Sequence, residues 1–310
     1  MKIRNEKGQA TVITVVFLVV LLGMAALVLD IGSWYRADRA TQSTADAAAL
    51  AGAQALPYDS NTARTLAVQY AGKNGGGVTN GDVTITSSPY SANDTIKVKV
   101  HRSASGVFTK LFGVNSVGVG SKATARASLM QSAQYVAPIG VNIKHPMLKG
   151  GPASCPCYGP AYATTLPLGK TGAPGSFDLL NIDGSKGGTG GQILANWILH
   201  GYSGYLPIGS YLSDTGAKWN DSLVQNALDQ RMHTDPVLLF PVYDRLSGTG
   251  ANAVYHVVGW AAFHITGHTA SGNSGSITGW FERVTWDGIE STAGDGSNPD
   301  LGARTVKLID

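Results

Sequence analysis

The feature that most constrains this chain is a run of twenty uncharged residues near its N-terminus, from Ala10 to Leu29. As a helix with a rise of about 1.5 Å per residue, this run is roughly 30 Å long, which is the thickness of the hydrocarbon core of a bilayer. It has no polar face: its two threonines, Thr11 and Thr14, can satisfy their hydroxyls on the preceding helical turn. We therefore expect a helix that spans a membrane.

The residues that flank the run predict its orientation. Three cations precede it, Lys2, Arg4 and Lys7, whereas the two arginines that follow it are offset by two aspartates. By the positive-inside rule, this asymmetry favours a cytoplasmic N-terminus. A cleaved signal peptide would have a shorter apolar region and a small-residue cleavage site, but here the run leads directly into Asp30. We expect a retained single-pass anchor in the cell membrane with the bulk of the chain extracytoplasmic.

The composition argues against two classes of function, nucleic-acid binding and a zinc site with four cysteines. Only 14% of the residues are charged and the net charge is +3, which is too small a basic excess to predict a nucleic-acid partner. The only two cysteines are Cys155 and Cys157, so a zinc site with four cysteines is excluded. The two cysteines could form a local disulfide, remain free thiols or link two chains, and an extracytoplasmic location favours oxidation.

The chain after the span continues its helix to about Leu56, because no proline interrupts it before Pro57 and residues 45–55 are rich in alanine. At helical spacing the small residues of this segment form one stripe, which consists of Ala45, Ala48, Ala49, Gly52 and Ala53. Another backbone could approach such a stripe closely. We expect a packing face for either the protein's own domain or a partner helix.

Residues 61–72 predict a second helix, and the pattern then changes to a period of two at 83–85, 96–100 and 123–127, which predicts three half-buried strands. Between the last two strands, four apolar residues share a helical face: Val107, Phe108, Leu111 and Phe112. A small α+β unit that ends near Met130 follows from these patterns.

From about Pro138 the chain is rich in glycine, proline and aromatic residues, and five of its six tryptophans lie beyond this point. Periodicity predicts helices at 191–200 and 219–232 and strands at 237–243, 254–265 and 276–286. The predicted class is α+β, in three parts. Residues 1–30 are the cytoplasmic tip and anchor, residues 31–130 the long helix with the α+β unit, and residues 138–310 a β-rich extracytoplasmic domain.

The N-terminal fifty residues carry an ordered set of features: Gly8-Gln9 before the span, Asp30-Ile31-Gly32 after it, Tyr35-Arg36, and Gln42-x-x-x-Asp46 followed by the alanine run to Ala53. This set resembles the N-terminal region of TadE/TadG-like proteins of the tight-adherence (Tad/Flp) pilus-assembly family. The segment from Asp94 to Ala127 and the C-terminal half are similar, less specifically, to regions found in the same group.

The resemblance implies a membrane-anchored structural or assembly component, minor pilin-like or envelope-spanning, of a Tad/Flp-type pilus or related secretion complex. It implies no enzymatic activity and no cofactor. The implied partners are the lipid bilayer, other Tad components and a second copy of the chain through the N-terminal helix. Processed pilins have Glu at the fifth position after the cleavage site, whereas the fifth residue after Gly8 is Ile13. Pilin processing is therefore not implied.

The tryptophan-rich second half keeps an alternative function open, namely a carbohydrate-binding, cell-wall-binding or hydrolytic domain. No catalytic or metal-ligating set stands out from spacing. The segment Asp183-Gly-Ser185-Lys-Gly187 lacks the second serine of a metal motif of the form Asp-x-Ser-x-Ser. Three histidines, His256, His264 and His268, would lie on one face of a strand, but residues eight apart on a strand are roughly 26 Å distant.

Overall fold

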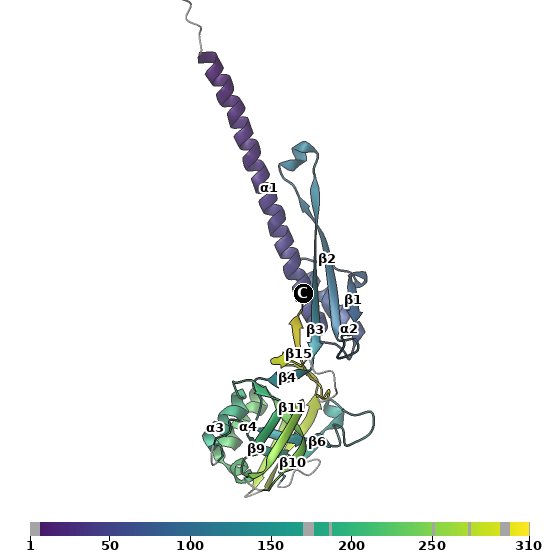
Figure 1. Ribbon diagram of the computed structural model, residues 1–310, viewed down its shortest axis with the longest axis vertical. Coiled ribbons are helices and arrows are strands. Elements are labelled where there is room, and N and C mark those ends of the chain that lie inside the picture. Colours follow the sequence, from purple (N-terminus) through teal and green to yellow (C-terminus); the bar gives the residue numbers. More distant parts are fainter. Residues whose placement is uncertain are drawn as a thin grey trace, which may run out of the picture. The chain divides into compact units, whose positions relative to one another are not determined.

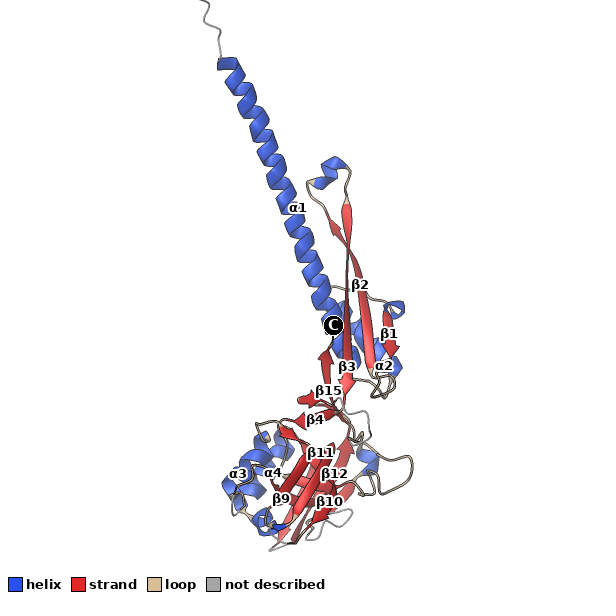
Figure 2. Ribbon diagram, in the orientation of Figure 1, coloured by secondary structure: helices blue, strands red, loops and turns tan. Residues whose placement is uncertain are grey.

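The computed structural model describes residues 7–169, 177–185, 188–249, 252–271, 274–291 and 298–309. The chain forms two compact units: unit 1 consists of Met1–Arg126 and Lys307–Asp310, and unit 2 of Ala127–Val306. Both units combine helices and strands, which confirms the predicted α+β class (Figure 2). The sequence did not indicate that the last residues of the chain return to unit 1.

Unit 1 begins with α1, a single helix of 47 residues from Lys7 to Ala53 (Figure 1). At about 1.5 Å per residue it is roughly 70 Å long. The apolar span and the alanine-rich segment are thus one continuous helix, as predicted. The helix ends just before the Leu56-Pro57 peptide bond, because proline has no N–H and its ring disfavours helical geometry at the preceding residue.

A short second helix, α2, follows from Ser60 to Lys73. It starts at Asp59, whose carboxylate accepts hydrogen bonds from the backbone N–H groups of Asn61 and Thr62, each at 2.9 Å. It ends at Asn74, before three glycines with positive φ at Gly75–Gly77. The chain then forms the 3₁₀ turn η1 (Asn80–Asp82) and enters the sheet.

The sheet of unit 1 is an antiparallel meander of β1 (Val83–Thr86), β2 (Thr95–Ser105) and β3 (Ser116–Ser128). The β2–β3 hairpin carries the short 3₁₀ helix η2 (Thr109–Phe112) at its tip. The strands alternate as predicted, and their buried side chains are Val83, Ile96, Val98, Val100, Ala123 and Ala125. These residues pack against buried alanines of α1 and α2, so the core of unit 1 consists largely of small side chains.

Unit 2 contains the remaining elements. Its helices are η3 (Pro160–Tyr162), α3 (Gly191–His200), η4 (Gly216–Asn220) and α4 (Ser222–Thr234). Its strands are β4 (Met130–Ala133), β5 (Ile139–Asn142), β6 (Thr164–Pro167), β7 (Phe177–Asn181), β8 (Leu206–Pro207), β9 (Gly209–Ser213), β10 (Val237–Ser247), β11 (Val254–Ser271), β12 (Ser274–Glu282), β13 (Val284–Thr285) and β14 (Gly288–Glu290). The last strand, β15 (Ala303–Leu308), carries the chain out of unit 2.

The main sheet of unit 2 closes into a ring. Its strand order is β10-β5-β7-β9-β11-β12-β6, and an additional pairing of β10 with β11 joins five strands in a closed circuit. The β10–β5 pair is parallel and the other pairs are antiparallel. Closure removes two exposed sheet edges, and a ring of this size has room only for side chains. Its interior contains Phe240, Tyr243 and Val257, all fully buried.

The predicted helix at 191–200 coincides with α3, whereas the one predicted at 219–232 begins later, at Ser222. Asp221 caps α4 by accepting a hydrogen bond from the N–H of Leu223 at 2.9 Å. Trp219 belongs to η4 instead and is fully buried. The strand expected at 276–286 is divided at Arg283 into β12 and β13.

Candidate functional site

The side chains of the apolar span of α1 are exposed along its length, and no other described part of the chain covers them. The large apolar side chains between Val12 and Leu29 are each between 48% and 69% exposed. Among the described residues, α1 is the one helix long and apolar enough to cross a membrane, and its apolar stretch has no buried residues. A single-pass membrane anchor fits this arrangement. Lys2 and Arg4, on which the predicted orientation partly depends, lie outside the described residues.

Asp30, the residue directly after the span, is 1% exposed and fixes the tip of the β2–β3 hairpin. Its carboxylate accepts three backbone hydrogen bonds, from the N–H groups of Val107 (2.9 Å), Phe108 (3.0 Å) and Thr109 (2.7 Å). A carboxylate suits this place because it accepts several N–H bonds at once, and hydrogen bonds to an ionised group are stronger than neutral ones. Asp30 therefore ties α1 to the hairpin.

Gln42 makes a second connection between α1 and the sheet. Its side-chain amide donates to the backbone carbonyl of Lys122 on β3 at 3.2 Å and to the carboxylate of Asp46 at 2.7 Å. Asp46 lies one helical turn further along α1, where it can orient the amide. The spacing of Gln42 and Asp46 in the sequence thus corresponds to a pair that attaches the helix to β3.

The stripe of small residues faces the interior of unit 1. Ala45, Ala48, Ala49 and Ala53 are fully buried, and Gly52 is buried with them. A Cβ atom at Gly52 would lie 2.5 Å from Cδ1 of Ile96 on β2 and 2.8 Å from the carbonyl oxygen of Ala63 on α2. The stripe is therefore occupied by α2 and β2 of its own unit, and any association through α1 has to use its other faces.

Arg102 on β2 adds a polar clamp to these packing contacts. Its Nη2 donates to the carbonyl oxygens of Asn74 (2.8 Å) and Gly76 (2.9 Å) and to the hydroxyl of Thr44 on α1 (2.8 Å). The Thr44 hydroxyl also bonds to the carbonyl of Asn74 at 2.6 Å. The guanidinium thereby joins α1, β2 and the loop after α2.

Comparison with known families bears on this set of contacts. Residues 8–55 match the family model Tad, described as "Putative Flp pilus-assembly TadE/G-like". This chain therefore carries a Tad-type N-terminal region, as its residues predicted. No curated protein and no solved structure matches the chain. The matched segment is essentially α1, and it includes Asp30, Gln42, Asp46 and the small-residue stripe.

In unit 2, most tryptophans are core residues. Trp197, Trp219 and Trp260 are each at most 7% exposed. Trp280 is half-buried and stacks on His264, with 4.3 Å between ring centroids. Trp286 is half-buried as well and donates its indole N–H to the carbonyl of Gln134 at 2.7 Å. The tryptophan content of this half thus reflects packing more than an exposed stacking surface.

One cavity of unit 2 includes an aromatic wall. It has a volume of about 320 Å³ and is lined by Tyr135, His200, Arg231, Asp235, Thr285, Trp286 and Asp287. The Arg231 guanidinium pairs with Asp235 at 3.0 Å and donates to the carbonyls of Leu199 and Val237. The side of the cavity formed by α4 is therefore charged and fixed, which leaves Trp286 and Tyr135 as its apolar surfaces.

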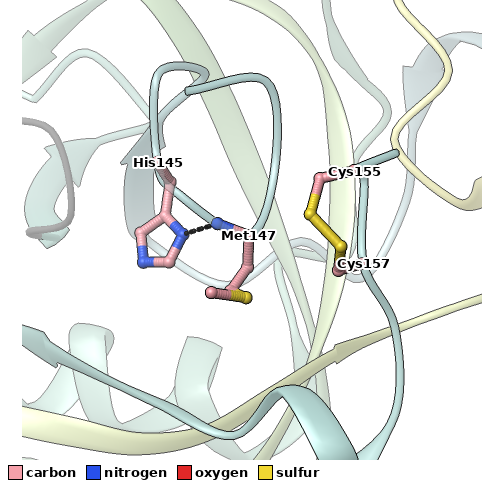
Figure 3. The surroundings of a disulfide bond; sticks show 4 residues. All are labelled: His145, Met147, Cys155 and Cys157. Carbon is pink, nitrogen blue, oxygen red and sulfur yellow. Dashed lines mark hydrogen bonds between the residues drawn. A yellow bond between two sulfur atoms is a disulfide. The ribbon is translucent and has the colours of Figure 1, made fainter. Parts of the chain in front are cut away.

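Cys155 and Cys157 are joined by a disulfide, with their Cα atoms 4.4 Å apart (Figure 3). The backbone N–H of Cys157 donates to the carbonyl of Met147 at 3.0 Å, and the N–H of Met147 donates to Nδ1 of His145 at 3.0 Å. His145 is 1% exposed, and its burial lowers its pKa to about 4. The disulfide is thus connected to a buried histidine through the backbone of Met147.

A buried carboxyl group lies inside the strand ring of unit 2. Tyr243 on β10 donates its hydroxyl to Asp178 on β7 at 3.0 Å, and Tyr255 on β11 packs edge-on against Tyr243. Burial raises the pKa of Asp178, and it also raises the pKa values of both tyrosines. All three side chains are at most 4% exposed, so they have little access to a substrate. The described residues contain no group of three or more His, Cys, Asp or Glu side chains that could hold a metal ion.

Three of these contacts were not foreseen from the sequence. By flanking charge alone, Asp30 is simply an anion after the span, and Lys122, the partner of Gln42 on β3, and the partners of Arg102 lie far away in the chain. The order of the Tad-like features was the one local signal that pointed to Asp30 and Gln42. Of the rejected metal motif, Asp183 and Ser185 form a turn with an N–H···carboxylate bond of 2.9 Å, while Gly187 lies outside the described residues.

Proposed function

We propose that this protein is a membrane-anchored structural component of a Tad/Flp-type pilus-assembly or related secretion complex. In this proposal α1 crosses the membrane with its N-terminus in the cytoplasm, and the rest of unit 1 and all of unit 2 lie outside. The observation that carries the proposal is that the Tad-matched segment divides at Asp30. Before Asp30 the helix is bare and apolar, and after it the helix is attached to unit 1 by Asp30, Gln42 and the small-residue stripe.

This division suits an anchor that must hold a folded unit close to the bilayer. The apolar half of the helix is compatible with lipid, because an α-helix satisfies its own backbone hydrogen bonds. The other half is bound to its unit by buried small side chains and charge-assisted hydrogen bonds, so unit 1 cannot swing freely about the anchor. Because the helix is held in this way, its orientation in the bilayer determines the orientation of the rest of unit 1. A fixed orientation suits a protein that has to bind other components of an assembly.

The orientation can be tested with tags at the two ends of the chain. Protease added to intact spheroplasts should degrade a C-terminal tag and leave an N-terminal tag protected. The reverse pattern would overturn the proposed topology.

The assembly role needs a second experiment. Deletion of the gene should abolish or reduce Tad-type surface filaments or secretion, and the tagged protein should co-purify with other Tad components from detergent extracts. The chain with Asp30→Asn should complement the deletion poorly, whereas Asp38→Asn, an exposed aspartate on the same helix, should restore it. Normal filaments and secretion in the deletion strain, with no Tad component recovered, would contradict the proposal.

The cavity beside Trp286 favours a second candidate function, the binding of cell-wall carbohydrate by unit 2. A cavity with two aromatic side chains and several charged groups has the composition of a sugar site. Saturable binding of the full-length protein to purified wall glycan, lost in Trp286→Ala and retained in Trp280→Ala, would support it. Equal binding by both variants, or none by the parent protein, would remove it.

A further inference from the structure

The tip of the β2–β3 hairpin exposes an apolar surface. The apolar tip consists of Val107, Phe108, Leu111, Phe112 and Val114, which are 66%, 37%, 83%, 81% and 42% exposed. Single exposed apolar residues are common, but five within eight consecutive positions form a patch that a water-facing hairpin would not need. The sequence predicts that four of these side chains, all except that of Val114, share a helical face. In the structure η2 is a single short turn, and its two apolar side chains are exposed.

The position of this patch is fixed by Asp30. Because the Asp30 carboxylate binds three consecutive N–H groups of the tip, the tip lies at the level where the apolar span of α1 ends. Figure 1 shows the hairpin beside α1, with η2 at the end that points toward the N-terminal half of the helix. The apolar tip therefore lies next to the end of the apolar span.

Most backbone N–H groups of the tip are hydrogen-bonded within the protein, so the tip could leave water at little cost. At least seven of the nine N–H groups from residue 106 to residue 114 donate to partners within unit 1, three of them to Asp30. Gly113, with φ of +84°, allows the tight turn that makes two of these bonds. Unsatisfied backbone groups are what normally exclude loops from lipid, and here most of the donors are satisfied.

We propose that the apolar tip is a second membrane contact, inserted into the lipid interface of the leaflet where α1 leaves the bilayer. Leu111 and Phe112 face the acyl chains, and the exposed ammonium of Lys110 reaches the headgroups. On α1, Tyr35 is 58% exposed and accepts hydrogen bonds from Arg39, a pair suited to the same interfacial layer. Two contacts, held together by Asp30, would fix the tilt of unit 1 on the membrane.

The proposal rests on the proposed anchor, and a fluorescence experiment separates the two. The full-length protein is reconstituted in vesicles of phosphatidylcholine with one third phosphatidylglycerol. The only native cysteines are joined in a disulfide, so an environment-sensitive dye can be attached to one introduced cysteine. The three variants are Leu111→Cys at the tip, Val19→Cys in the span, and Gln69→Cys on the exposed face of α2 as the matched control.

We expect the dye at position 111 to show blue-shifted emission and to be quenched by lipids that carry a nitroxide near the headgroup. The dye at position 19 should respond to nitroxides deeper in the chains, and the dye at position 69 should respond to neither. Quenching at 19 but emission at 111 equal to that at 69 would overturn the membrane contact and leave the anchor intact. Blue-shifted emission at 111 without lipid quenching would overturn it in favour of a protein partner, and lack of quenching at 19 would overturn the anchor itself.

Discussion

Substitution of Gly52 by alanine tests whether α1 packs against its own unit as tightly as the structure indicates. A Cβ atom at this position would lie 2.8 Å from the carbonyl oxygen of Ala63 and 3.2 Å from Cβ of Ala67, both on α2, and 2.5 Å from Cδ1 of Ile96. The isoleucine side chain can rotate away. The carbonyl oxygen belongs to the backbone of α2, so α1 and α2 have to move apart.

The expected magnitude is the balance of two effects. Alanine is favoured over glycine in a helix by up to about 1 kcal/mol, whereas an extra group in a tightly packed core costs about 1–3 kcal/mol. We expect Gly52→Ala to destabilise the contact by about 1–2 kcal/mol. Gly72 is the matched control, because it lies in α2 and a Cβ atom there would meet nothing within 4 Å. Gly72→Ala should be neutral or stabilising.

Hydrogen exchange followed by mass spectrometry measures this difference in the full-length protein in detergent. A loss of 1–2 kcal/mol corresponds to roughly 5- to 30-fold faster exchange of the protected amides of α2 and β2. Peptides from unit 2 provide the internal reference, because the substitution lies outside that unit. Unchanged or slower exchange of α2 in Gly52→Ala would refute the argument, since it would mean that the two helices are not in close contact.

Three further predictions concern polar groups. Asp30→Asn removes a charged acceptor of three N–H groups, so the amides of the hairpin tip should exchange at least about tenfold faster, while Asp38→Asn should leave them unchanged. The pKa of His145 is about 4 in the folded protein and near 6.5 when unfolded, so the unfolded state gains more protons as the pH falls between these values. The free energy of unfolding of unit 2 should therefore fall by about 1–3 kcal/mol between pH 6.5 and pH 4, measured by denaturant titrations followed by tryptophan fluorescence. His145→Gln should abolish this decrease. Persistence of the full decrease in the variant would exclude this histidine as its source. In Arg102→Lys, the ammonium group cannot reproduce the planar guanidinium that binds the carbonyls of Asn74 and Gly76. Amide hydrogen exchange at residues 74–77 should therefore become faster, by the factor that corresponds to a loss of about 1–2 kcal/mol in local stability. Amide protection equal to that of the parent protein would argue against the clamp.

The long helix and the strands of unit 1 could be predicted because their signals are local. An uncharged run, an alanine-rich continuation and a proline at 57 define the extent of α1, and alternation defines β2 and β3. The stripe of small residues could be recognised as a packing face, but not its partner. Alanine and glycine side chains accept any close backbone, so the stripe is equally compatible with α2 and with a helix of another chain.

The unpredicted features depend on distant residues. Asp30 and the hairpin tip are 77 residues apart, and a lone aspartate after an apolar run equally fits the simple end of a span. The strands β5 and β7 are buried throughout, so they lack the alternation by which strands are recognised. For the apolar tip, periodicity indicated four apolar side chains on one face, but an apolar face has the same pattern whether a protein core or a lipid phase covers it.

The return of the last residues to unit 1 has a consequence for how the chain is made. The N–H of Ile309 donates to the carbonyl of Thr124 on β3 at 2.9 Å, so β3 obtains this partner only when the C-terminus has been synthesised. Unit 2 comprises the roughly 180 residues in between. At about 5–20 residues per second, their translation takes on the order of 10–40 s. Throughout that interval α1 is already available for insertion, while one edge of the sheet that it carries stays open to other strands, including those of neighbouring nascent chains.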